Sequence, residues 1–175
     1  NKPLELALDL LKHSNMVCNN EYRFVTPDFG IVISFANMES HLFRLGQPYR
    51  LKEGRIIRGL RGKARIIINL IEYTVYPQTI VTFIPGSIVE LLEFTPDYDF
   101  QMIAVDKDFL PLLRRDQLFE SHVRQNLVPR VTDTEWKLSD AYFKLIWETV
   151  QEKPFRREVV QHLLAALLHN IKYIR

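Results

Sequence analysis

Residues 54–76 read GRIIRGLRGKARIIINLIEYTVY, and this stretch decides the fold class of the chain. Its β-branched and aromatic residues come in short runs that glycine-containing turns separate. The same pattern extends over residues 21–105, where the breaks are Thr26–Asp28, Gly46–Pro48, Lys52–Gly54, Arg61–Lys63, Pro77–Gln78 and Pro85–Ser87. This spacing predicts at least six strands in a sandwich or barrel, because each strand must bury one face and closure removes exposed edges.

Two helices are expected near the C-terminal end, forming an antiparallel hairpin. Asp133 or Thr134 can cap the first, which should end before Lys153–Pro154. The second runs over residues 155–174, with apolar residues at three- and four-residue steps. These apolar residues are Val160, Leu163, Leu164, Leu167, Leu168 and Ile171. They either pack only on the first helix and the barrel or also form a dimer contact. The dimer is favoured, because the leucines spread over more than one stripe.

Two shorter helical segments are predicted, one over residues 3–13 and one within residues 106–125. The expected organisation is a barrel with a short N-terminal helix over residues 1–125, followed by a dimerising hairpin over residues 126–175. The chain begins Asn1–Lys2–Pro3 and ends within an apolar helical pattern, so we expect it to be a fragment of a longer protein.

Composition limits the classes of function. The 175 residues are 47% hydrophobic, which is enough for one substantial core. The formal net charge of +2 is too small to indicate a basic surface that binds nucleic acid. The single cysteine, Cys18, excludes an intrachain disulfide framework and fits a reducing compartment. No apolar run approaches the roughly 18–20 residues that span a bilayer. We therefore expect a cytoplasmic protein that does not enter a membrane.

Catalytic signatures are absent from the sequence. The five histidines are scattered over different predicted elements, and there is no nucleophile elbow, His-Glu-x-x-His, phosphate-binding loop or CxxC. We expect no metal, no cofactor and no enzymatic activity.

Arg58 is the first candidate ligand-binding residue. A strand over residues 55–61 would place Ile56, Arg58 and Leu60 on one side. A guanidinium inside a barrel needs a carboxylate or an anionic ligand, because burying it alone is very costly. Arg58 is thus expected either to pair with an internal glutamate, such as Glu72 or Glu90, or to contact a ligand.

Residues 64–76 are predicted as one strand that is apolar on both faces. Asn69 and Glu72 interrupt these faces, and polar residues in such a setting serve either a buried hydrogen-bond network or a pocket. With Arg58 and Glu90, they complete the set of candidate ligand-binding residues, which rests on strand parity.

The order of three motifs resembles the amino-terminal domain of AraC-type transcription regulators. The motifs are YRLKEGRII at residues 49–57, the glycine hairpin RGKA at 61–64, and TIVTFIPGS at 79–87. The resemblance covers residues 29–175. It implies a double-stranded β-helix, or cupin, that binds a small effector, often a sugar, followed by a helical hairpin that forms a homodimer. DNA binding would belong to a C-terminal helix-turn-helix domain that lies outside this chain.

The sequence departs from metal-dependent cupins, whose first motif carries His-x-His and a glutamate. Residues 62–76 contain no histidine, and the histidine of the second motif is also lacking after Pro85–Gly86. This departure disfavours the alternative of a cupin enzyme, such as a sugar isomerase or epimerase. A cyclic-nucleotide-binding barrel is disfavoured too, because residues 85–90 do not supply its Gly-Glu and arginine. The resemblance implies that the effector favours one arrangement of the N-terminal segment or the hairpin.

Overall fold

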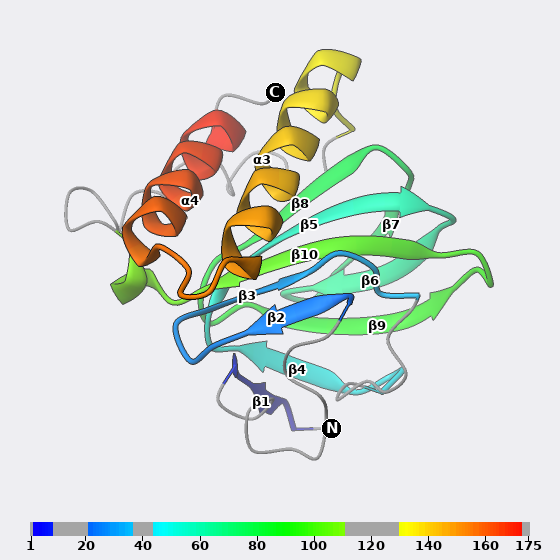
Figure 1. Cartoon of the computed structure of the whole chain (residues 1–175). Helices are drawn as coiled ribbons and strands as arrows, with labels where there is room; N and C mark the ends of the chain where they lie inside the picture. The colour runs from blue at the N-terminus through cyan, green and yellow to red at the C-terminus, as the bar shows by residue number, and fades with distance from the viewer. Residues whose placement is uncertain (1, 9–20, 37–43, 111–129, 173–175) are drawn as a thin grey trace.

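Ten strands form two facing five-stranded sheets, and two helices cover the outer face of one sheet (Figure 1). The computed structural model describes residues 2–8, 21–36, 44–110 and 130–172. Sheet A has the order β1-β4-β9-β6-β7, and sheet B has the order β2-β3-β10-β5-β8. The strands are β1 Leu4–Leu6, β2 Arg23–Val25, β3 Phe29–Val32, β4 Pro48–Leu51, β5 Gly54–Arg61, β6 Ala64–Ile68, β7 Ile71–Val75, β8 Thr79–Phe83, β9 Ile88–Phe94 and β10 Asp99–Val105. All neighbouring strands are antiparallel except β1 and β4. The prediction of a mainly β sandwich or barrel is confirmed as a sandwich of two sheets.

The six predicted breaks all fall between strands or overlap a strand by its first or last residue, as Arg61–Lys63 does at the end of β5. Gly62 has a φ of +69°, and a Cβ there would lie 2.7 Å from the Cα of Tyr98, so only glycine fits this turn. The prediction of one strand over residues 64–76 is wrong. Asn69 and Leu70 have φ values of 47° and 74°, and this left-handed turn folds β6 back onto β7 as a hairpin.

The N-terminal segment is a strand rather than a helix at residues 4–6. β1 pairs in parallel with β4, Leu4 opposite Tyr49 and Leu6 opposite Leu51. Hydrogen bonding to a free sheet edge outweighs the weak helical periodicity of so short a segment. The remainder of the predicted helix, from residue 9, lies outside the described residues, as does most of the segment predicted within residues 106–125. At the start of the latter, Lys107–Phe109 form a 3₁₀ turn.

The C-terminal hairpin is confirmed, with α3 at Asp133–Gln151 and α4 at Arg157–Lys172. The cap of α3 is Thr132, one residue before the first of the two predicted positions, Asp133 and Thr134. Its side chain accepts from the Glu135 backbone N–H, while the Glu135 carboxylate accepts from the Thr132 N–H, forming a capping box. Both helices pack on the outer face of sheet B, where apolar residues of β3, β5, β8 and β10 meet α3 and α4 in one core.

The predicted dimerisation stripe lies largely in this core. Val160, Leu164, Leu167 and Leu168 are 0% exposed and Ile171 is 3% exposed, whereas Leu163 is half-buried. Residues already buried within one chain have no further surface to bury against another. Their dimerisation role stays a prediction, and their contacts within the chain are with α3 and sheet B.

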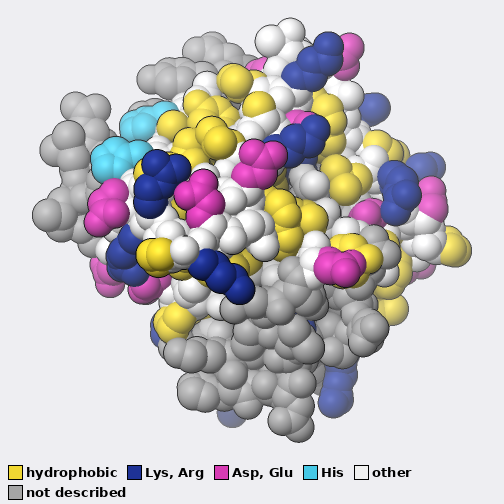
Figure 2. All heavy atoms as spheres, viewed as in Figure 1, with side chains coloured by type: hydrophobic (Ala, Val, Ile, Leu, Met, Phe, Trp, Pro, Cys, Tyr) yellow, Lys and Arg dark blue, Asp and Glu magenta, His cyan; other side chains and the backbone are white. Residues whose placement is uncertain are grey.

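The helical face of the molecule carries charges of both signs. Lys and Arg side chains are interspersed with Asp, Glu and hydrophobic side chains over the described atoms in this view (Figure 2). None of the described helices is long and apolar enough to cross a membrane.

Candidate ligand cavity

A cavity of about 150 Å³ lies between the two sheets. Its described lining is mostly hydrocarbon, contributed by every strand of both sheets. The lining residues are Leu6, Arg23, Val25, Val32, Phe35, Tyr49, Leu51, Arg55, Ile57, Ile66, Val75, Val81, Phe83, Val89, Leu91, Tyr98, Phe100 and Met102. Only two arginines and two tyrosines among them carry polar side-chain atoms, so a ligand here meets an apolar wall with a few convergent polar groups.

Arg55 is the best-described polar group of the cavity. It is 3% exposed, and its Nη2 donates to Glu53 Oε1 at 3.2 Å and to the Leu6 carbonyl at 3.4 Å. Among the described residues, its Nη1 contacts only the Met102 thioether, at 3.7 Å, and its Nε has no hydrogen-bond partner. Burial lowers the pKa of Arg55, against the raising effect of Glu53. This guanidinium therefore retains donor capacity for a further acceptor.

Three more polar side chains border the cavity. Arg23 lies on β2 and is 6% exposed. The Tyr49 hydroxyl accepts from the Arg44 backbone N–H at 2.7 Å. Burial, and then the neighbouring Asp99 carboxylate, raise the pKa of Tyr98, so its phenol remains a neutral hydroxyl at physiological pH.

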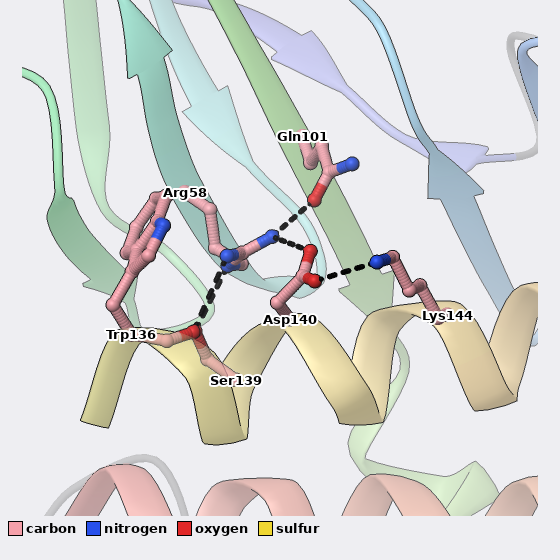
Figure 3. A network of polar contacts seen from close by, with 6 residues as sticks. All are labelled: Arg58, Gln101, Trp136, Ser139, Asp140 and Lys144. Carbon is pink, nitrogen blue, oxygen red and sulfur yellow. Dashed lines mark hydrogen bonds and ion pairs between the residues drawn. The ribbon is translucent and has the colours of Figure 1, made fainter. Parts of the chain in front are cut away.

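The opposite face of β5 carries a second buried arginine, Arg58, whose polar contacts are shown in Figure 3. It is 1% exposed and lies between the sheet and α3, with its guanidinium carbon 4.0 Å from the centroid of the Trp136 ring. Its Nε donates to Ser139 Oγ at 2.9 Å, and its Nη1 bonds to Asp140 at 3.2 Å and to the Gln101 side chain. Burial lowers the pKa of Arg58 and Asp140 opposes this shift.

The expected position of Arg58 inside the barrel is wrong, although its burial was predicted. Ile56 and Arg58 face α3 and α4, while Arg55 and Ile57 face the cavity. Its carboxylate partner is Asp140 rather than Glu72 or Glu90. Helices cover the outer face of sheet B, so both faces of β5 are buried. The face of β5 that carries apolar residues is therefore not necessarily the face that borders the cavity.

The other three candidates also lie away from the cavity. Asn69 is exposed in the β6–β7 turn, where its Oδ1 accepts from the Ile88 N–H. Glu72 lies on the outside of sheet A and pairs with Arg65. Glu90 lies between two cavity residues of β9, Val89 and Leu91, and so faces the other side of that strand. The structure does not bring these four residues together, and their ligand-binding role stays a prediction.

Sequence reasoning missed Arg23, Arg55, Tyr49 and Tyr98. A signal for Arg55 was present, because Glu53 and Arg55 are two residues apart and side chains at that spacing share one face of an extended chain. For Arg23 and the two tyrosines, we find no sequence signal that separates them from ordinary core or surface positions.

Comparison with known proteins gives likenesses of fold only. No protein-family model matches the chain, and no curated protein matches it. Among solved structures, a ToxT variant from Vibrio cholerae is 10% identical over 87% of this chain and 55% of its own, with a TM-score of 0.48. The AraC-like transcriptional activator CuxR is 11% identical over 81% of this chain and 52% of its own, with a TM-score of 0.47.

Cupin enzymes give similar, shorter matches. Oxalate decarboxylase from Bacillus subtilis is 16% identical over 45% of this chain and 21% of its own, with a TM-score of 0.35. The chain thus spans about half the length of the two regulators and about a fifth of the decarboxylase. The structural neighbours include AraC-like regulators and cupin proteins, and membership of either group stays a prediction.

Proposed function

We propose that this chain is the regulatory domain of an AraC-type transcription regulator. In this proposal the two sheets form a double-stranded β-helix of the cupin type, and a small-molecule effector binds between them. The protein acts in the cytoplasm as a homodimer without catalysing a reaction. DNA is bound only by a helix-turn-helix domain outside the 175 residues.

One observation carries the proposal: β5 bears a buried arginine on each face. Arg55 borders the cavity, and Arg58, three residues further on, is bonded to Ser139 and Asp140 of α3. In this proposal a displacement at Arg55 is passed along β5 to α3 through the Arg58 contacts. The neighbouring strand β10 shares this coupling, because Met102 borders the cavity and Gln101 bonds to Arg58.

The N-terminal segment is a second element that an effector could displace. The Leu8 N–H donates to Glu53 Oε2 at 3.1 Å, and the Leu6 carbonyl accepts from Arg55. The segment is therefore held by Arg55, which borders the cavity, and by its ion-pair partner Glu53. The effector can shift either element only by as much as its affinity differs between the two arrangements.

Two properties of the cavity support a sensor rather than an enzyme. Its described lining contains no aspartate, glutamate or histidine, the residues that most often act as general acids and bases. The lining residues also come from both sheets, so a small molecule would be held between them. Sugars are poor candidates, because their hydroxyls would lack hydrogen-bond partners against this lining.

The test is a thermal-shift screen of the purified chain against sugars, sugar acids, apolar acids and neutral metabolites, with molar mass from light scattering. A compound that stabilises the protein is then examined by amide hydrogen exchange. We expect a dimer in which the compound slows exchange in β5 and changes it in α3.

Asp140→Asn is the matched variant, since it weakens the contact of Arg58 with α3 and leaves the cavity lining intact. The variant should bind the compound but transmit less of the change to α3. If no compound class stabilises the protein, or if a bound compound changes exchange only at the cavity, the sensor proposal is wrong. Turnover of a bound compound would instead identify an enzyme.

A further inference from the structure

The size and chemistry of the cavity indicate a narrower class of ligand. At about 150 Å³ it matches the volume of an engineered apolar cavity that binds benzene. A compact body of roughly six to ten heavy atoms therefore fits within this volume. The walls that such a body would contact are aliphatic and aromatic, including Phe35, Phe83 and Phe100.

The polar groups of the lining select for an anion. The described lining contains two charged side chains, Arg23 from β2 and Arg55 from β5, and both are guanidinium groups. It contains no carboxylate. A carboxylate is the anion that a guanidinium binds best at short range, through two parallel N–H···O bonds.

Arg55 has the donors for this contact. Glu53 accepts from its Nη2, while among the described residues Nε has no partner and Nη1 contacts only a thioether sulfur. A buried N–H donor without an oxygen acceptor is energetically unfavourable. A ligand that brings an acceptor would satisfy this donor, and the free energy of binding would become more favourable.

We propose that the cavity binds a small monocarboxylate with an aromatic or branched aliphatic body, its carboxylate on the Arg55 guanidinium and its body between the sheets. This inference rests on the proposed sensor function and names its effector class. A single carboxylate is favoured over two, because the lining away from the arginines offers only the hydroxyls of Tyr49 and Tyr98 among the described residues and no further cation for a second charge.

The first experiment uses the unaltered protein and three acids, namely benzoate, phenylacetate and isovalerate, each paired with its neutral amide. Binding is measured by calorimetric titration at pH 7. We expect at least one acid to bind about tenfold or more tightly than its amide, because the charge-assisted bonds are lost in the amide. An amide that binds as tightly as its acid in every pair overturns the inference.

The second experiment locates the carboxylate. Arg55→Met combined with Glu53→Gln removes both charges together, so neither is left buried alone. This double variant should lose the preference for the acid, whereas Arg65→Met, on the outside of sheet A, should retain it. Val81→Phe fills the cavity from β8 and should abolish binding of all three acids. Retention of the acid preference in the double variant rules out Arg55 as the anchor.

The outcomes separate this inference from the sensor function. If sugars or other neutral compounds stabilise the protein and the acids do not, the sensor function stands and the monocarboxylate class is wrong. If no compound of any class binds, both are wrong.

Discussion

Tyr98 should make the protein sensitive to alkali. Its ring is 6% exposed, and burial raises its pKa above the usual value of 10.0. Above pH 10 the phenol ionises in the unfolded chain but not in the folded one, so the unfolded state binds fewer protons. The free energy of unfolding should then fall by at most about 1.4 kcal/mol per pH unit.

Urea unfolding of Tyr98→Phe between about pH 8 and 11 checks this linkage. The variant should show a shallower fall than the unaltered protein, whereas Tyr76→Phe, at a site 40% exposed, should behave like the unaltered protein. Equal slopes for all three proteins would refute the assignment to Tyr98.

The stability of the protein should depend on Asp140, because Asp140 is the carboxylate that pairs with the buried Arg58. Asp140→Ala leaves Arg58 without its carboxylate while 1% exposed. We expect a loss on the order of 2 kcal/mol, below the roughly 3–5 kcal/mol of a fully buried pair, because Asp140 is 35% exposed.

Arg58→Met in the same chain should restore part of that stability, since Met replaces the aliphatic stem without the charge. Chemical unfolding of both single variants and the double variant gives the coupling between them. A double variant less stable than Asp140→Ala would show that the guanidinium stabilises the core without this anion.

At the scale of elements, the β6–β7 hairpin contains a correctable strain. Leu70 has a φ of 74° and is 94% exposed, so it has a left-handed backbone without compensating burial. Leu70→Gly should raise the free energy of unfolding by about 0.5–1 kcal/mol, measured from the urea midpoint. Leu70→Ala should give no such gain, because alanine retains a Cβ. An equal gain in both variants would place the effect in the lost leucine side chain rather than in the backbone.

Helix α4 gives a test that separates core packing from dimer contact. Leu164 is 0% exposed within one chain, so Leu164→Ala should lower the free energy of unfolding by about 2–5 kcal/mol. Light scattering should give the same molar mass as the unaltered protein. A change in molar mass without loss of stability would instead place Leu164 at a subunit interface.

The positions of helices and strand ends were more predictable from the sequence than the contacts that each element makes. Turn residues such as Pro85–Gly86 fix where strands end by local stereochemistry, and the α3–α4 hairpin follows from helical periodicity, so both could be derived from the sequence. The β6–β7 break could not, because Asn69–Leu70 lacks the glycine that marks such a turn. Likewise, β1 forms only because β4 offers an edge.

At the scale of the whole molecule, the candidate site depended on which face of sheet B the helices cover. Alternation correctly separated Arg55 from Arg58, but assigned the cavity to the wrong side. Long-range packing decides which face of β5 borders the cavity. Because both faces of this strand are buried, the hydrophobicity of its side chains does not distinguish the faces. The residues that border the cavity can therefore be identified only when the arrangement of the two sheets and the helices is known.

The strand order has a consequence for how the chain folds. β10 pairs with both β3 and β5, and β9 pairs with both β4 and β6, so partners in the sheets are often distant in sequence. Such high contact order slows folding. During synthesis, β2–β3 and β5–β8 cannot join into sheet B until β10, ending at Val105, has left the ribosome. Until then the edges of β3 and β5 that pair with β10 stay open, and such unpaired edges favour aggregation of a nascent chain.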